Sequence, residues 1–220
     1  MIFYITPPNT DFFIDTLDRY FQKRYDIFVV KRQWEIPHKN GREMDQFDTD
    51  DATHIVWEEN GVILGGARLL PTHKPYLLGD LFPQMLNHSA PRDPQIWEIS
   101  RFFIDLPDNF DRAAHPAVRR LFASIFEFGC LVNAKEFIAL TEPHIETMMR
   151  RINIPWERTS ETFPIPEGGL MVSGKSDVSL EICNLIRDTL PTNFITTWIP
   201  LTPNLLTRAT QSLNMLPLLK

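Results

Sequence analysis

Residues 97–104 combine the composition of a β-strand with two charged side chains. Aromatic and β-branched residues dominate this stretch, which predicts a strand. Glu98 and Arg101 lie three positions apart among residues that favour burial, and a buried charge needs a partner or a water-filled cleft. Taken alone, the stretch suits an exposed edge strand as well as a site that uses a carboxylate and a guanidinium.

The spacing of these charges makes a geometric prediction. Side chains alternate between the two faces of a regular strand, so Glu98 and Ser100 are expected on one face and Arg101 on the other. Glu98 and Arg101 can reach one substrate only if the strand bulges or ends between them. A smooth, fully paired strand from 97 to 104 would argue against a shared site.

Further charges lie upstream. A helical pattern over residues 11–30 places Arg24 on its apolar stripe, where an arginine ordinarily extends to solvent. The irregular segment 31–51 ends in five acids within nine positions, without the spacing or the central glycine of a calcium loop. These acids are either exposed surface or a site for something cationic.

Composition limits the class of protein. The chain has 220 residues and a formal net charge of −6, which suits one large domain. It has neither the basic stripe of a nucleic-acid-binding protein nor the run of about 18 apolar residues that spans a membrane. The N-terminus lacks the features of a secretory signal. Cys130 and Cys183 suit neither a zinc site nor a disulfide framework, so we expect buried free thiols in a cytoplasmic protein.

Other segments predict alternating strands and helices. Segments 53–57 and 62–64 flank an Asn-Gly turn and form a hairpin, after which Gly65 and Gly66 suggest a bulge or a close backbone approach. The strand 97–104, a helix at 116–132, a strand at 137–141 and a helix from 143 to 151 follow the order of a βαβ crossover. We also expect a strand at 2–6, a long connection over 71–96, strands at 159–163 and 170–172, a helix at 178–188 and an apolar tail from Thr189 that packs on the body or on a partner. The whole chain reads as a single α/β domain.

Several common catalytic motifs are absent from the sequence. There is no Gly-x-Gly-x-x-Gly dinucleotide loop, no phosphate-binding Walker loop and no Gly-x-Ser-x-Gly nucleophile elbow. The six histidines are scattered without the spacing of metal ligands, so we expect no metal site. Any site must be built from carboxylates, arginines and aromatic residues.

From residue 24 to residue 104 the chain resembles the acyl-homoserine-lactone synthases, the LuxI-type bacterial autoinducer synthases. The residues that carry the resemblance, in order and with compatible gaps, are Arg24, Phe28, Trp34, Asp45, Asp48, Arg68, Phe82, Trp97, Glu98, Arg101 and Phe102. It implies a GNAT-like α/β/α sandwich with a mixed, mostly antiparallel central sheet. It also implies S-adenosylmethionine as a substrate rather than a cofactor. Its amine is acylated from an acyl thioester, and its carboxylate then closes onto the γ-carbon to release methylthioadenosine and an N-acyl homoserine lactone, a quorum-sensing signal.

The resemblance also implies roles for individual residues. Glu98 is the candidate base for the amine, directly or through water. The acids Asp45 and Asp48 suit the cationic amine and sulfonium, and an arginine suits the carboxylate. Arg24 and Arg101 could equally be structural partners of these acids. The full set is Glu98, Arg101, Asp45 and Asp48 for catalysis, and Arg24, Phe28, Trp34, Arg68 and Phe82 for binding S-adenosylmethionine.

The acyl pocket is expected between the central strands and the helix after residue 143. For each apolar candidate, plain core packing is the simpler alternative. Thr141 is the most informative, because in the family a threonine at the matching position accompanies acyl chains oxidised at carbon three. The candidates are Ile99, Ser100, Phe103, Leu121, Ile125, Thr141, Ile145 and Met149. Residues 1–104 would thus bind S-adenosylmethionine and residues 105–220 the acyl group.

The acyl donor stays open between coenzyme A and acyl carrier protein. Segment 41–52 resembles a subgroup that uses coenzyme A, although the pyrophosphate loop of related acetyltransferases is not visible after residue 104. Basic residues could serve either donor: Arg119, Arg120, Lys135, Arg150 and Arg151. The alternatives to a synthase are an N-acyltransferase of the same fold that acts on another amine, and a non-catalytic protein that binds an acyl thioester or S-adenosylmethionine.

Overall fold

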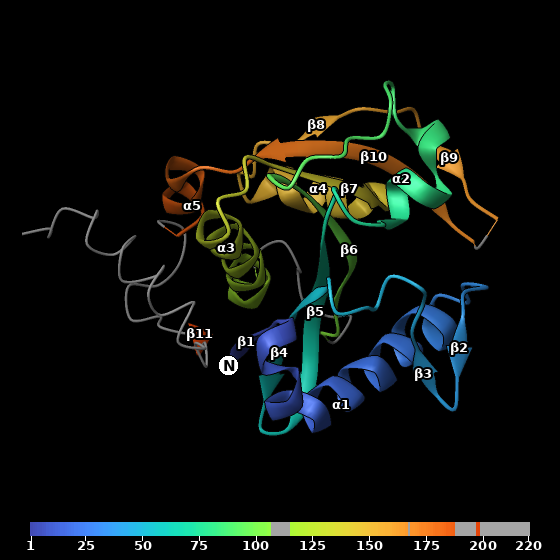
Figure 1. The fold of residues 1–220 in the computed structure, drawn as a ribbon, viewed down its shortest axis with the longest axis vertical. Helices are drawn as coiled ribbons and strands as arrows, with labels where there is room; N and C mark the ends of the chain where they lie inside the picture. Colours follow the sequence, from blue (N-terminus) through green and yellow to red (C-terminus); the bar gives the residue numbers. More distant parts are fainter. Residues whose placement is uncertain (107–114, 167, 188–196, 199–220) are drawn as a thin grey trace, which may run out of the picture.

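The computed structural model describes residues 1–106, 115–166, 168–187 and 197–198, and its fold is shown in Figure 1. One central sheet contains strands from both ends of this range. Neighbouring strands are antiparallel except β1 with β11 and β6 with β7. The order across the sheet is β11 (Thr197–Trp198), β1 (Ile2–Ile5), β4 (Thr53–Glu59), β5 (Val62–Pro71), β6 (Ile96–Ile104), β7 (Glu136–Thr141), β10 (Leu170–Asp177) and β8 (Glu157–Arg158).

Helices cover both faces of the sheet. On β1, Ile2 and Tyr4 belong to a core cluster with α3 (Pro116–Leu131) and α4 (Pro143–Arg151), whereas Phe3 and Ile5 pack with α1 (Ile14–Arg24). This alternation follows from the two-residue repeat of a strand. α5 (Leu180–Arg187) packs beside α3. The predicted GNAT-like α/β/α sandwich, with its mixed and mostly antiparallel sheet, is confirmed.

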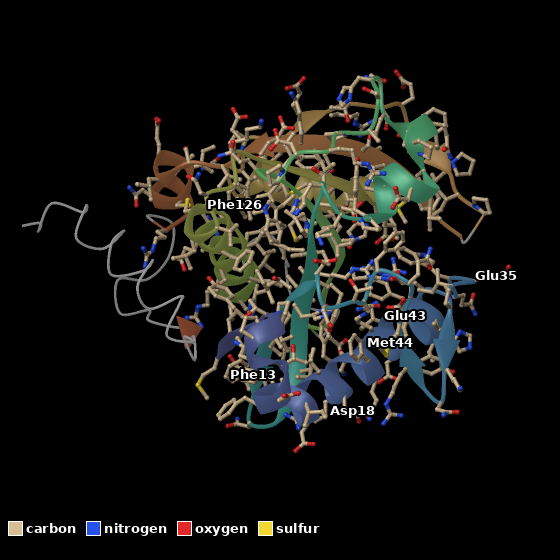
Figure 2. The ribbon with its side chains drawn as sticks, viewed as in Figure 1. Phe13, Asp18, Glu35, Glu43, Met44 and Phe126 are labelled. Carbon is tan, nitrogen blue, oxygen red and sulfur yellow. The ribbon has the colours of Figure 1, made fainter. Side chains whose placement is uncertain are left out.

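The crossover from β6 through α3 to β7 places two strands in parallel, as predicted. α3 and α4 each begin with a proline, which suits the first helical position because its missing N–H would have no partner there. Along α3 buried residues occur on nearly every side of the helix, so it lies inside the molecule; Figure 2 shows Phe126 of this helix in the interior.

The predicted first helix has three parts. A 3₁₀ segment, Pro7–Phe13, leads into α1, and α1 continues into the π-helical segment η2, Tyr25–Lys31. π-Helical segments are rare in proteins, and those that occur are often found at functional sites. The wider turn rotates the side chains that follow it. Here it turns the chain so that Phe28 faces inward, and Arg24, which was expected to extend to solvent, is fully buried.

β6 is not a regular strand. Ser100 pairs with Arg68 and Phe103 with Gly66, so two residues of β6 lie opposite one residue of β5. Arg101 lies in this bulge with φ +52°, a left-handed conformation that costs a non-glycine residue about 1–3 kcal/mol. The condition set for a shared site of Glu98 and Arg101 is therefore met.

The bulge coincides with a split in the sheet. β6 pairs with β7 only from Ile96 to Ile99, although both strands continue beyond that point. In Figure 1 the part of the sheet with β7 and β10 runs across the part with β4 and β5. The two halves of the sheet thus diverge after Ile99, and a space opens between them.

Other predictions differ in their bounds. The connection 71–96 contains α2 (Leu77–Leu81) and a 3₁₀ turn, Pro83–Met85. The expected strand at 159–163 is only β9 (Phe163–Pro164), and the strand expected to end at 172 continues to Asp177 as β10. β2 (His38–Lys39) and β3 (Arg42–Glu43) form a small separate hairpin. Gly66 is a close approach as predicted: a Cβ there would lie 2.6 Å from the Tyr20 ring.

The tail prediction concerns residues 189–220, which lie outside the described residues except for Thr197–Trp198 in β11. Cys130 and Cys183 are free cysteines, as expected, but only Cys183 is buried and Cys130 is half-buried. Among the helices that the structure describes, none has both the length and the apolar character needed to cross a bilayer.

Candidate active site

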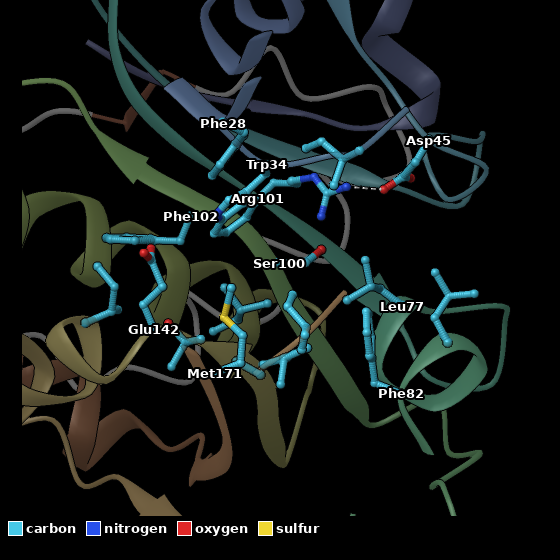
Figure 3. Close-up of a pocket in the computed structure, with 18 of the residues that line it drawn as sticks. Phe28, Trp34, Asp45, Leu77, Phe82, Ser100, Arg101, Phe102, Glu142 and Met171 are labelled. Atoms are coloured by element: carbon cyan, nitrogen blue, oxygen red, sulfur yellow. Dashed lines mark hydrogen bonds and ion pairs between the residues drawn. The ribbon is translucent and has the colours of Figure 1, made fainter. Parts of the chain in front are cut away.

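A cavity of about 330 Å³ lies where β6 and β7 separate. Ser100, Arg101 and Phe102 line it from β6, and Leu140, Thr141 and Glu142 line it from β7 and the residue after it. Figure 3 shows Arg101 and Phe28 on one side of the cavity and Glu142 and Met171 on the other. The predicted site residues that line it are Phe28, Trp34, Asp45, Phe82, Ile99, Ser100, Arg101, Thr141, Ile145 and Met149.

One wall of the cavity is aromatic and charged. The rings of Phe28 and Trp34 are stacked, with centroids 5.1 Å apart and planes 21° apart. The guanidinium carbon of Arg101 lies 5.9 Å from the Phe28 ring, within the range of a cation–π contact. A flat aromatic pair beside fixed charges suits a ligand that has a ring and ionic groups.

Behind this wall lies a network of buried ions. It contains three arginines and three carboxylates, so its formal charges cancel. Their side chains are at most 8% exposed. The members are Arg24, Arg68, Arg101, Glu43, Asp45 and Asp48.

Arg24 forms the inner half of this network. Its Nε donates to Glu43 Oε2 at 2.6 Å, and its two terminal nitrogens bind the two oxygens of Asp48 at 2.7 and 3.0 Å. Burial by itself would raise the pKa of Asp48, but the adjacent Arg24 and Arg68 outweigh it and hold that pKa well below its usual range. Arg24 and Asp48 are thus a permanent ion pair, and neither lines the cavity.

Arg68 and Arg101 form the outer half and share Asp45. Arg68 binds both oxygens of Asp45, at 2.5 and 3.1 Å, and donates to Ser100 Oγ at 3.1 Å. Arg101 binds Asp45 Oδ2 at 2.8 Å and Glu43 Oε1 at 3.1 Å. The strained backbone of Arg101 is therefore held by two ion pairs, which aim its guanidinium at the cavity wall.

Glu98 is fully buried beside the cavity rather than on its surface. Its two oxygens accept hydrogen bonds from the backbone N–H groups of Leu77 and Leu78, at 3.1 and 2.5 Å, at the start of α2. Burial raises the pKa of Glu98 to about 7, although the two N–H donors oppose that rise. A carboxyl group with this pKa can exchange a proton near neutral pH.

The opposite wall is almost entirely apolar. Phe102 stacks on Phe122 of α3 with ring centroids 4.7 Å apart, and Ile145 and Met149 of α4 complete the wall. Because of the bulge, Phe102 points toward α3 while Phe103 points toward α1. This wall can bind a hydrocarbon chain, and its one charged side chain, Glu142, is paired with Arg32.

Three predicted pocket residues are corrected by the structure. Phe103 is fully buried against Tyr20 and Phe28, on the α1 face of the sheet. Leu121 and Ile125 are fully buried in the core between α3 and the sheet. None of the three is among the residues that line the cavity. Their burial is that of core side chains, which was the simpler alternative for each.

Sequence reasoning also missed several residues of the site. Glu43 is fully buried and binds both Arg24 and Arg101, although the acidic segment around it looked like exposed surface or a cation site. A count of charges could not have pointed to Glu43, because the predicted site already had three arginines and three acids. Other lining residues that were not predicted are Arg32, Glu35, Ile36, Pro37, Gln46, Leu77, Leu81, Phe102, Phe122, Ala139, Leu140, Glu142, Trp156, Ile165 and Met171.

The comparisons with known proteins agree with this geometry. The family model described as "Autoinducer synthase" matches residues 12–173. The chain belongs to this family. The predicted family and the predicted acyltransferase class of enzyme are thereby confirmed.

Relatives and solved structures point in the same direction. An acyl-homoserine-lactone synthase of Ralstonia nicotianae is 39% identical over 137 residues, which are 60% of this chain and 67% of that protein. An isovaleryl-homoserine lactone synthase of Bradyrhizobium diazoefficiens is 38% identical over 133 residues, 60% of this chain and 58% of that protein. The structure of the CoA-dependent acyl-homoserine lactone synthase BjaI with SAM and isopentyl-CoA has a TM-score of 0.80 and 25% identity, covering 96% of this chain and 99% of that one.

Proposed function

We propose that this autoinducer synthase transfers an acyl group from acyl-coenzyme A to the amine of S-adenosylmethionine, which then lactonises. The products are an N-acyl homoserine lactone, methylthioadenosine and coenzyme A. The observation that carries the proposal is that one cavity joins a wall of aromatic rings and fixed charges to a wall of hydrocarbon. An ionic nucleoside and an acyl chain can therefore meet at the split between β6 and β7.

S-adenosylmethionine binds the charged wall in this proposal. The stacked Phe28 and Trp34 offer a surface for its ring and its sulfonium, since cations and flat rings both bind aromatic faces. Of the three arginines of the network, Arg101 is the one that lines the cavity, so we assign the carboxylate of the ligand to it. Arg24, Arg68 and Asp48 hold this wall in place from behind.

Glu98 takes the proton from the amine in this proposal. The amine must be neutral to attack the thioester carbonyl, and a base with a pKa of about 7 is suited to that transfer. The carboxylate lies behind Leu77, so the proton travels through an intervening water molecule. The nitrogen then attacks the carbonyl carbon and the carbon–sulfur bond of the thioester breaks. The departing sulfur takes the second proton of the nitrogen, so coenzyme A leaves as the free thiol. Finally the carboxylate of the acylated intermediate attacks the γ-carbon. The bond between that carbon and the sulfonium sulfur breaks, and methylthioadenosine leaves with the electron pair.

Two observations favour coenzyme A over a carrier protein as the donor. The relative from Bradyrhizobium diazoefficiens is named an isovaleryl-homoserine lactone synthase, and the similar BjaI structure is described as CoA-dependent and contains isopentyl-CoA. Segment 41–52 resembles the subgroup that uses coenzyme A. The acyl chain itself enters along Phe102, Phe122 and Met149.

One assay tests the proposal. The purified protein is incubated with S-adenosylmethionine and with matched acyl groups on coenzyme A and on acyl carrier protein, and methylthioadenosine and lactone are quantified. We expect both products with at least one acyl-coenzyme A. If the protein acylates another amine and releases no methylthioadenosine, it is the alternative N-acyltransferase. Binding without turnover would identify a non-catalytic binder. If both products form only with acyl carrier protein thioesters, the synthase reaction stands and the proposed coenzyme A donor is rejected.

A further inference from the structure

The cavity has a second pair of charged side chains that lies outside the buried network. Arg32 follows the π-helical segment η2, and Glu142 precedes α4. Arg32 Nη1 and Glu142 Oε2 are 2.5 Å apart, with 22% and 20% of their side chains exposed. β6 and β7 are no longer paired at this level, so the ion pair spans the open end of the split between them.

Arg32 is held in the way that a bound cation would be held. Its guanidinium carbon lies 5.1 Å from the Phe28 ring and 5.3 Å from the Trp34 ring, and the carboxylate of Glu142 neutralises it. Aromatic faces with an adjacent carboxylate bind organic ammonium ions through the same contacts. In this structure the protein's own guanidinium occupies such a site.

Glu142 differs from the other carboxylates that line the cavity. Asp45 uses both oxygens for Arg68 and Arg101 and also accepts the N–H of Phe47. Glu35 is exposed and lies at the outer edge of the molecule in Figure 2. Glu142 lies below Phe102 in Figure 3, close to the apolar wall, and its ion pair with Arg32 reaches solvent.

We propose that Glu142 binds the ammonium group of S-adenosylmethionine, which takes the place of Arg32 against that carboxylate. The exchange replaces one cation by another, so neither charge is left buried without a partner. The amine would then lie beside the split, where the acyl chain enters. This inference rests on the proposed function, since it names the recognition of the acceptor in the same cavity.

Two ligands separate this role from a structural one. S-adenosylmethionine has the ammonium group, whereas methylthioadenosine has the nucleoside without it. Calorimetric Kd values for both are compared between the wild type, Glu142→Gln and the control Glu136→Gln. Glu136 lies on the same β7, pairs with Lys175 and also has a side chain that is 20% exposed. We expect Glu142→Gln to weaken S-adenosylmethionine binding about tenfold or more, while methylthioadenosine binding stays within twofold. The control should bind both ligands as the wild type does.

Arg32→Gln is the decisive second variant, because it breaks the same ion pair and keeps the carboxylate. We expect its affinity for S-adenosylmethionine to equal or exceed that of the wild type. Equal losses in both variants, or equal losses for both ligands, would mean that the ion pair only braces the fold and would overturn the inference, as would unchanged binding in Glu142→Gln. If the wild type itself fails to bind S-adenosylmethionine, the proposed function fails and the inference fails with it.

Discussion

The wall of the cavity that carries Asp45 and Arg101 is backed by buried ions, whereas the wall that carries Phe122 and Met149 is backed by hydrocarbon. In the ionic wall each charge has partners at set distances, so the removal of one group leaves the buried network with an unbalanced charge. In the apolar wall the contacts have no fixed direction, and side chains of similar volume can replace one another. The first wall is therefore suited to hold one acceptor, and the second can adapt to different acyl chains.

The largest effect is expected from a break in the ionic wall. Asp48→Asn leaves Arg24 and Arg68 without one of their counter-ions in a fully buried position. We expect the free energy of unfolding to fall by about 3–5 kcal/mol, as is usual when one partner of a buried pair is removed. Urea denaturation measures this loss.

Asp51→Asn is the matched control for that prediction. Asp51 lies in the same acidic segment, but its side chain is 43% exposed and pairs with Lys74 at the surface. We expect little change in the free energy of unfolding. Similar stabilities for the two variants would show that the ionic wall is not held by its charges.

The next effect concerns catalysis beside the ionic wall. Glu98→Gln removes the proposed base, and we expect kcat to fall about a hundredfold or more, with a small change in the KM for S-adenosylmethionine. In the wild type the charged form of Glu98 is the active base, so kcat should rise as the pH increases through about 7. The variant should lose this limb of the profile. If the limb persists in Glu98→Gln, another group is the base.

A smaller effect is expected in the apolar wall. Met149→Ala enlarges the cavity, so the ratio of kcat/KM for long to short acyl-coenzyme A substrates should rise about tenfold, a typical value for an added methylene or two. Leu121→Ala lies in the core on the same side of the sheet and should leave this ratio unchanged. A shift of the ratio in both variants would mean that the cavity and the core are not separate.

The smallest effect is expected from Thr141→Val. Thr141 lines the cavity, and its hydroxyl could donate a hydrogen bond to a ketone at carbon three of the acyl chain. One such bond contributes about 1 kcal/mol, so the preference for 3-oxo over saturated chains should fall about fivefold. If the preference is unchanged and both chain types are still accepted, Thr141 does not recognise the ketone and only ends the strand β7.

The ionic wall was more predictable from the sequence than the apolar wall. Arg24, Asp45 and Arg101 entered the prediction together through the family resemblance, whereas the residues alone placed Arg24 at the solvent and Asp45 in an acidic segment that could equally be exposed surface. The apolar wall is drawn from helices such as α3, which has buried residues on most of its sides. No pattern of hydrophobic residues can then say that Phe122 faces the cavity and Leu121 faces the core.

The bulge in β6 also limited what the sequence could predict about the site. The sequence predicted that Glu98 and Arg101 could share a site only if the strand were irregular, and the structure has that irregularity. Which residue would adopt the left-handed conformation depended on the ion pairs of Arg101 with Glu43 and Asp45, from a distant segment. Glu43 itself was missed because charges within a loop do not reveal which of them turn inward.

The bulge also has a consequence for the length of this strand. Since two residues of β6 lie opposite one residue of β5, the residues before and after Arg101 are out of step by one position. Deleting Arg101 would leave one residue opposite Ala67, so Ser100 could stay paired with Arg68 and Phe103 with Gly66 in a regular ladder. Phe103 would then keep its place in the core that packs against α1, but the strand would lose its left-handed residue and the ion pairs of Arg101 with Glu43 and Asp45. The loss of this one extra residue should therefore spare the packing of the sheet and remove the guanidinium from the cavity wall.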